Sequence, residues 1–282
     1  MLTLPLPNFS PAKVYEAARD RFLDASYKKR LSDGQNDILT CSTDYVAKAS
    51  SGDLHKIVAN AAVPPHILAG DMSKLYTQGL LRKNSEARTY YEKLRLSSPS
   101  RVCPLCMHRP VRTLDHFLPK AEYAAYAVLP ANLVPCCRDC NSEKDETAPQ
   151  DRAATLIHPY FDNIDENEWL GCEINHHIGY CTATFFIKSD GVADDLRPRL
   201  ISHMEVLDLY ELYEIEAARE LNEMAVAVTE TFVAAGPDGV RNLCEKIANS
   251  RETLARNYWR AVLWRAAAND EKFRNLEWNA AA

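Results

Sequence analysis

The chain has 282 residues, of which 46% are hydrophobic, so it is long enough for one large or two modest domains with buried cores. Its formal net charge of −6 argues against a protein that coats nucleic acid over its whole surface. Residues 1–11 lack the basic start and the apolar run of a secretory signal, and no later stretch resembles a membrane span. Nine cysteines, an odd number, argue against a secreted disulfide scaffold, so we expect a cytoplasmic protein with no membrane contact.

Residues 1–96 are predicted to form an N-terminal helical segment. Ser10 and Pro11 are typical of a helix N-cap followed by a first-turn proline. Apolar side chains then follow at helical spacing, at Val14, Ala17, Ala18 and Phe22. Further short helices are expected up to residue 96, and the serine- and proline-rich residues 97–100 are predicted to be a linker.

Two Cys-x-x-Cys pairs follow, Cys103/Cys106 and Cys137/Cys140. Thiolates at this spacing can both reach one Zn²⁺ from a tight turn, and two such pairs complete a closed tetrahedral site of the structural kind. We therefore expect structural zinc, with buried thiols that merely pack as the alternative. Cys136 could compete as a ligand, but only Cys137 has the two-residue spacing to Cys140.

The residues bracketed by the cysteine pairs predict two short strands, and a helix follows. Residues 111–114 are prone to β-structure, and residues 132–135 predict the second strand. A polar helix is expected from near Arg138, with no breaker before Pro149. A zinc ion held by both pairs would tie the base of the first strand to the start of this helix.

Four side chains of this strand–strand–helix unit are of the types needed for phosphodiester cleavage. A neutral imidazole, His116, can take a proton from water at working pH. Asp115 and Asn141 offer oxygen ligands of the kind that Mg²⁺ or Mn²⁺ prefers. Lys144 lies on the same helix face as Asn141 and could contact a phosphate. Each residue alone would also fit a role without catalysis, such as a surface dipeptide at residues 115–116 or a helix cap at Asn141.

Three stretches together resemble the HNH endonuclease motif of the ββα-metal (His-Me finger) superfamily in its four-cysteine zinc form. They are CPLC at residues 103–106, LDHFLPK at residues 114–120 and NLVPCCRDCNSEK at residues 132–144. The resemblance covers about residues 100–150. It implies a zinc-stabilised ββα-metal core that hydrolyses phosphodiester bonds with the help of Mg²⁺ or Mn²⁺.

The same resemblance implies roles for individual residues. His116 corresponds to the general base, and Asp115 to a ligand of the catalytic metal. Asn132 corresponds to the middle position of the motif, which orients the histidine through the backbone. Asn141 corresponds to the last position, where the family has either histidine or asparagine as a metal ligand.

The C-terminal part, residues 163–282, is predicted to contain a β-hairpin and helices. Residues 172–174 and 180–187 read as strands around Gly179, and the chain after Gly191 has helical periodicity to its end. The predicted fold is therefore α+β and mainly α, with an HNH core at residues 97–162 between the N-terminal helical segment and this C-terminal part.

A basic stretch leads into the proposed centre. From Arg82 to Lys120 there are nine basic residues against three acidic ones, a difference of +6. A phosphate backbone would have to lie near this stretch, although a solvated helix face explains its first part equally well. Because the rest of the chain is acidic, we expect modest affinity for nucleic acid and a need for a partner.

The order of the segments also resembles HNH effector nucleases of bacterial anti-phage defence, of the Septu type. This arrangement implies a partner ATPase of SMC-like or AAA type, and the chain itself has no glycine-rich phosphate-binding loop. In the His-Pro-Tyr turn at residues 158–160, His158 could be an extra ligand or phosphate contact, but a structural role is more usual for such a turn.

The sequence thus favours a metal-dependent HNH endonuclease acting on DNA. An RNA-cleaving enzyme of the same mechanism and an inert zinc-stabilised module that binds nucleic acid or protein are the alternatives. The joint presence of Asp115, His116, Asn132 and Asn141 favours the nuclease, because binding alone requires none of them.

Overall fold

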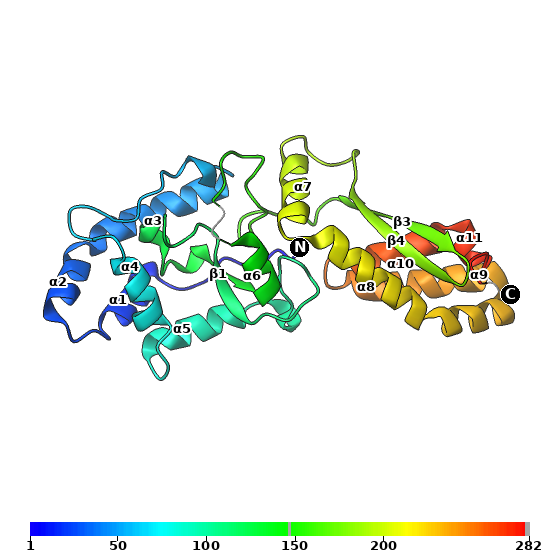
Figure 1. The fold of residues 1–282 in the computed structure, drawn as a ribbon, viewed down its shortest axis with the longest axis horizontal. Helices are drawn as coiled ribbons and strands as arrows, with labels where there is room; N and C mark the ends of the chain where they lie inside the picture. The colour runs from blue at the N-terminus through cyan, green and yellow to red at the C-terminus, as the bar shows by residue number, and fades with distance from the viewer. Residues whose placement is uncertain (146–147, 280–282) are drawn as a thin grey trace. The chain divides into compact units, whose positions relative to one another are not determined.

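A computed structural model describes residues 1–145 and 148–279. They divide into two compact units, which are Thr3–Asn163 (the first unit) and Ile164–Ala282 with Met1–Leu2 (the second unit) (Figure 1). Apart from Met1–Leu2, the predicted N-terminal segment and the predicted HNH core both fall within the first unit. The described residues are mainly helical, with two small antiparallel sheets, which confirms the expectation of a mainly helical α+β fold. None of the helices described is both long and apolar enough to cross a bilayer.

The first half of the first unit is helical. Its main helices are α1 (Pro11–Arg19), α2 (Ala25–Asp33), α3 (Gln35–Ser50), α4 (Asp71–Lys74) and α5 (Glu86–Arg95), and a π-helical turn spans Leu75–Leu80. The α1 helix begins at the predicted proline but ends before Phe22, whose ring instead packs edge-on against Tyr27 at 4.6 Å. Capping explains the next start, because the Asp24 carboxylate accepts hydrogen bonds from the first turn of α2.

Buried tyrosines hold these helices together. The Tyr15 hydroxyl donates a hydrogen bond to the Leu31 carbonyl at 2.8 Å, and the Tyr27 hydroxyl donates to the Asp71 carbonyl at 2.6 Å. Each ring fills apolar space while its hydroxyl satisfies a backbone group, which is the usual condition for burying tyrosine. The helices thereby form a rigid base for the segment that follows.

That segment is a strand–strand–helix unit. It consists of β1 (Thr113–His116), β2 (Leu133–Cys136) and α6 (Arg138–Lys144). The strands are antiparallel, with His116 opposite Leu133 and Thr113 opposite Cys136. The first strand was predicted at residues 111–114 but lies two residues further along the chain. It therefore includes Asp115 and His116 instead of ending before them. Helix α6 begins where predicted and ends at Lys144, because Asp145 leaves the helical conformation at φ 48°.

The second unit contains the predicted hairpin, with β3 (Leu170–His177) and β4 (Tyr180–Ile187) joined at Gly179. Gly179 has φ +88°, a conformation that favours glycine. The helices of this unit are α7 (Leu196–Val206), α8 (Leu209–Glu223), α9 (Ala225–Glu252), α10 (Trp259–Asn269) and α11 (Glu271–Arg274).

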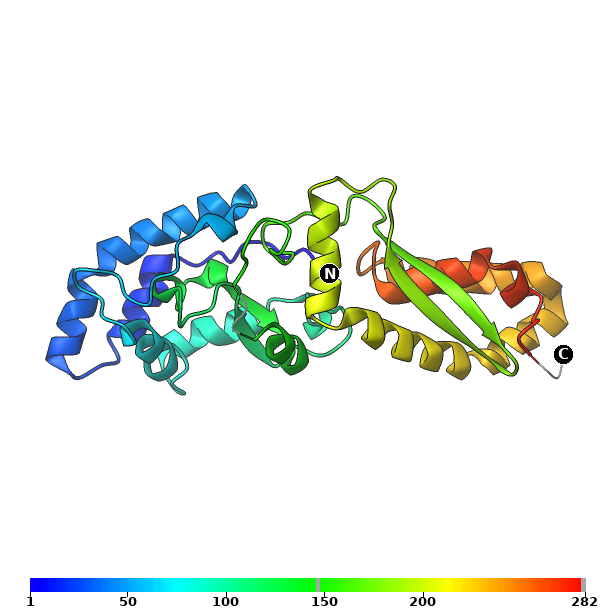
Figure 2. The same ribbon diagram turned by 45° about the horizontal axis from the view of Figure 1, so that its top comes forward.

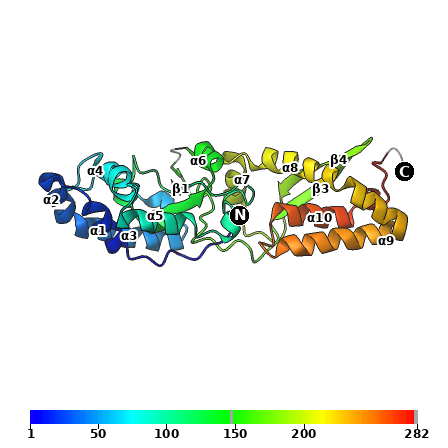
Figure 3. The same cartoon turned by 90° about the horizontal axis from the view of Figure 1, so that it is seen from below.

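Helices cover one face of the hairpin. Helix α8 packs on β4 and α10 packs on β3, with α9 beside α10 (Figures 2 and 3). Alternate residues of β4, such as Phe185, point into this core, where Tyr213 and Trp259 stack at 5.8 Å. Helix α9 kinks at Gly236 and Pro237, where the glycine has φ +65°.

Candidate functional site

Four cysteines form a compact cluster beside the strand–strand–helix unit. The sulfur atoms of Cys103, Cys106, Cys137 and Cys140 all lie within 4.8 Å of one another, and all four residues are buried and free of disulfides. Zinc–sulfur bonds of about 2.3 Å in a tetrahedron place sulfur atoms about 3.8 Å apart. The Cys106 and Cys137 sulfurs are 4.0 Å apart. The cluster could therefore hold a metal such as zinc.

Backbone amides support this cluster. The Arg109 amide donates a hydrogen bond to the Cys106 sulfur at 3.5 Å, and the Cys140 amide donates to the Cys137 sulfur at 3.3 Å. Such bonds favour the thiolate form that a metal needs. Cys136 is buried on β2 but does not belong to the group of four. The sequence spacing pairs Cys137, and not Cys136, with Cys140, and the positions of the sulfur atoms agree with this choice.

A polar pocket lies at the end of β1 and along α6. It has a volume of about 180 Å³ and is lined by Asp115, His116, Pro119, Lys120, Asn141 and Asp145. Three of the predicted site residues, from a strand and a helix, thus border one space. The other two predicted residues, Asn132 and Lys144, are buried and do not line it.

His116 is held in one orientation. Its Nε2 lies 2.9 Å from the Ala127 carbonyl oxygen, and its ring meets Tyr76 edge-on at 4.4 Å. A carbonyl can only accept, so Nε2 carries the proton and Nδ1 of the neutral ring is left as the acceptor. Burial lowers the pKa of His116 to about 3, while the bond to Ala127 acts in the opposite direction. The imidazole is therefore neutral at neutral pH.

Lys144 faces inward from α6. Its Nζ lies 3.2 Å from Asp115 Oδ2 and donates a hydrogen bond to the His116 carbonyl at 2.8 Å. Burial raises the pKa of the Asp115 carboxyl, and the nearby ammonium of Lys144 opposes that rise. We predicted a phosphate contact for Lys144, but its ammonium is instead engaged with the end of β1. Lys120, which lines the pocket, is the better-placed cation.

Asn132 closes the loop that connects β1 to β2. Its Oδ1 accepts hydrogen bonds from the Leu118 amide at 2.7 Å and from the Tyr45 hydroxyl at 3.0 Å. Its Nδ2 donates to the carbonyls of Leu118 and Tyr126, at 3.0 and 3.2 Å. The side chain thus joins the start of the loop, at Leu118, to its end, and also binds Tyr126, the residue before Ala127. Tyr45 comes from α3, 87 residues away, and sequence reasoning did not identify it.

His158 lies in the core behind this loop. Its ring packs on Phe117 at 4.1 Å, and its Nδ1 accepts a hydrogen bond from the Tyr160 amide at 3.2 Å. The Tyr45 hydroxyl lies 3.2 Å from its Nε2. These contacts give His158 a structural position, and it does not line the polar pocket.

Charge is divided unevenly between the two units. The first unit has 21 basic and 18 acidic residues, a net charge of +3, and the second has 12 and 21, a net charge of −9. Within the basic stretch, Arg88 and Arg95 both form ion pairs with Glu92, and Arg109 pairs with Asp139 at 2.7 Å. Part of that stretch is therefore already neutralised, whereas Lys120 faces the pocket.

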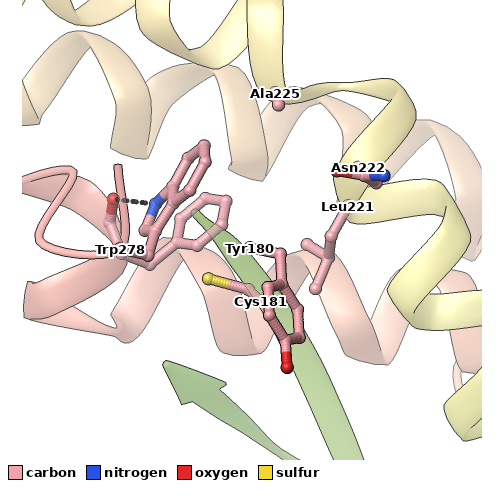
Figure 4. A pocket seen from close by; sticks show the side chains of 7 residues that line it. Tyr180, Cys181, Leu221, Asn222, Ala225 and Trp278 are labelled. Carbon is pink, nitrogen blue, oxygen red and sulfur yellow. Dashed lines mark hydrogen bonds between the residues drawn. The ribbon is translucent and has the colours of Figure 1, made fainter. Parts of the chain in front are cut away.

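The second unit also contains a small apolar pocket, shown in Figure 4. Tyr180, Cys181, Leu221 and Trp278 are among its lining residues, and the Trp278 indole donates a hydrogen bond to the Phe273 carbonyl at 3.3 Å. Its volume is about 10 Å³, roughly the space of one water molecule. The pocket is too small for a substrate, so we regard it as a packing gap.

Comparison with known proteins gives one informative similarity. The chain is similar to protein ea31 of Escherichia phage lambda, with 25% identity over an alignment of 295 positions that covers 97% of this chain and 99% of the phage protein. No family model matches the chain, and no solved structure matches it. The similarity extends over both units, and the name of the phage protein states no activity.

Proposed function

We propose that the chain is a metal-dependent endonuclease of the HNH type, with DNA as its expected substrate. The observation that carries this proposal is the single pocket at which Asp115, His116 and Asn141 meet beside a four-cysteine cluster. The residues come from β1 and α6, which is the ββα arrangement that the sequence resemblance implies. In this proposal the cluster holds zinc, which ties the loop before β1 to the start of α6.

The oxygen atoms of Asp115 and Asn141 are suited to a hard cation. Mg²⁺ or Mn²⁺ is usually bound through one or two carboxylates together with substrate phosphate. When bound, such a cation would stabilise negative charge on the scissile phosphate and on the leaving oxygen. Both residues are fixed by regular structure, Asp115 by β1 and Asn141 by the middle of α6.

His116 is the proposed general base. Because Nε2 donates to the Ala127 carbonyl, Nδ1 can accept a proton from a water molecule in the pocket. The oxygen of that water then forms a bond to phosphorus while the bond from phosphorus to the leaving oxygen breaks. The neutral state of the buried ring keeps the acceptor available at neutral pH.

Two residues act on the site through others. Asn132 holds the loop that presents the Ala127 carbonyl to His116, and Lys144 joins the end of β1 to α6. Lys120 is proposed to contact the substrate phosphate from the pocket wall. The positive charge of the first unit and the negative charge of the second support nucleic-acid binding by the first unit.

We also propose that the protein is an effector of bacterial anti-phage defence that acts with an SMC-like or AAA-type ATPase in the cytoplasm. The acidic second unit is better suited to a protein partner than to nucleic acid.

The decisive experiment is cleavage of plasmid, single-stranded DNA and total RNA by the purified chain with Mg²⁺ or Mn²⁺, beside His116→Ala. Cleavage by the wild-type chain alone supports the proposal and identifies the substrate class. Equal cleavage by the variant would remove His116 as the base. If neither protein cleaves, with or without an added ATPase partner, yet both bind nucleic acid, the inert zinc-stabilised binding module is favoured.

A further inference from the structure

The buried carboxylate of the pocket is already neutralised by the protein itself. Asp115 and Lys144 are 6% and 2% exposed, and their charged atoms lie 3.2 Å apart. The pair as a whole contributes no net charge to the pocket. Asn141 is uncharged, and Lys120 adds a positive charge to the wall. The charges of these four residues sum to +1, which is an unfavourable environment for a divalent cation.

Asp145 supplies the missing negative charge. It lines the same pocket as Asp115 and Asn141 and directly follows the last residue of α6. Its backbone leaves the helix at φ 48° and ψ −142°, and its side chain is exposed to solvent. An exposed carboxylate carries little desolvation cost, so it can attract a cation that Asp115 alone would not.

We infer that Asp145 is a third oxygen ligand of the divalent cation, beside Asp115 and Asn141. The inference rests on the cation site of the proposed function and adds a residue that the HNH resemblance does not assign. With Asp145 included, the charges of Asp115, Lys144, Lys120 and Asp145 sum to zero. Substrate phosphate would bring the remaining negative charge, which fits the usual reliance of Mg²⁺ on carboxylates together with phosphate.

The test uses Mn²⁺ binding to the full chain with its cysteine cluster loaded with zinc, measured by titration calorimetry. Asp145→Asn is compared with Glu143→Gln, which removes the same charge from an exposed residue of α6 that does not line the pocket. We expect Asp145→Asn to weaken Mn²⁺ binding about tenfold, as for loss of a unit charge near a divalent ion. Glu143→Gln should change it by less than about twofold, because the exposed Glu143 carboxylate does not line the pocket and is screened by solvent and salt.

Equal effects of the two variants would overturn the inference, because they would show only a general loss of negative charge. Absence of Mn²⁺ binding by the wild-type chain would also overturn it. Zinc content and thermal unfolding of both variants should match the wild type, since both substitutions are at exposed positions. The cleavage assay is a separate measurement. If the wild-type chain binds Mn²⁺ through Asp145 but cleaves no nucleic acid, the proposed function is contradicted and this inference is still supported.

Discussion

Lys144 Nζ lies 3.2 Å from Asp115 Oδ2, and the two side chains join the end of α6 to the end of β1 away from solvent. Burying two charges is costly, and their attraction offsets that cost only while both are present. The same ammonium donates to the His116 carbonyl. Lys144 therefore fixes the side chain of Asp115 and the backbone of His116, two adjacent residues that line the pocket.

This relationship predicts strong coupling between Lys144 and Asp115. Lys144→Met should lower the free energy of unfolding by about 3 kcal/mol or more, because it leaves a buried carboxylate without its partner. Lys144→Met combined with Asp115→Asn should cost about 1–3 kcal/mol less than the sum of the single variants. Urea unfolding of the four proteins gives the double-mutant cycle. Additive losses would show that the two charges do not stabilise each other.

The four-cysteine cluster and much of the pocket could be predicted because local spacing encodes them. Two residues between paired cysteines allow one metal to be shared whatever the rest of the fold. The sequence predicts Asp115 and His116 near a strand end and Asn141 on a helix, and a metal that ties the strand to the helix would bring them to one pocket. Such features depend on residues close in sequence.

Other parts of the site depend on packing between distant segments. Tyr45 binds Asn132 from a helix 87 residues earlier, and no local pattern marks that tyrosine. The Ala127 carbonyl is a backbone group whose position is set by the loop fold. The inward direction of Lys144 had a signal, since it shares a helix face with Cys137 at i+7. Cys137 belongs to the buried four-cysteine cluster, so a residue that shares its face can be buried against β1 rather than exposed to a phosphate.

Cys137→Ser should remove the metal and destabilise the first unit. A structural zinc contributes directly to folding, so we expect loss of about 3 kcal/mol or more and a fall of about 6–12 °C in Tm. Zinc content is measured by elemental analysis alongside thermal unfolding. Cys244→Ser is the matched control, since Cys244 is a buried thiol of α9 in the second unit, and this variant should keep one equivalent of zinc. A full equivalent of zinc in Cys137→Ser would contradict the ligand assignment.

Asn132→Ala should reduce both stability and the rate of cleavage. The substitution leaves the Leu118 amide and two carbonyls without their partner in a fully buried setting, at a cost of about 2–4 kcal/mol. Because the loop presents Ala127 to His116, we expect kcat to fall while the cation concentration for half-maximal rate stays near that of the wild type. Urea unfolding and cleavage kinetics measure the two effects. Unchanged kcat in a destabilised variant would limit Asn132 to a purely structural role.

Lys120→Ala tests which lysine contacts the phosphate. Lys120 lines the pocket, whereas the ammonium of Lys144 is buried, so only Lys120 is positioned to neutralise a phosphate oxygen. Its loss should lower kcat/KM by about 10-fold to 100-fold. It should also reduce the slope of the logarithm of the binding constant against the logarithm of the salt concentration by about one. Lys13→Ala, an exposed lysine of α1 outside the pocket, removes the same charge from the same unit and should change neither value appreciably. Equal effects of the two variants would mean that the first unit attracts nucleic acid through its overall charge. A specific loss in Lys120→Ala would place the scissile phosphate at the wall of the pocket that His116 and Asn141 share.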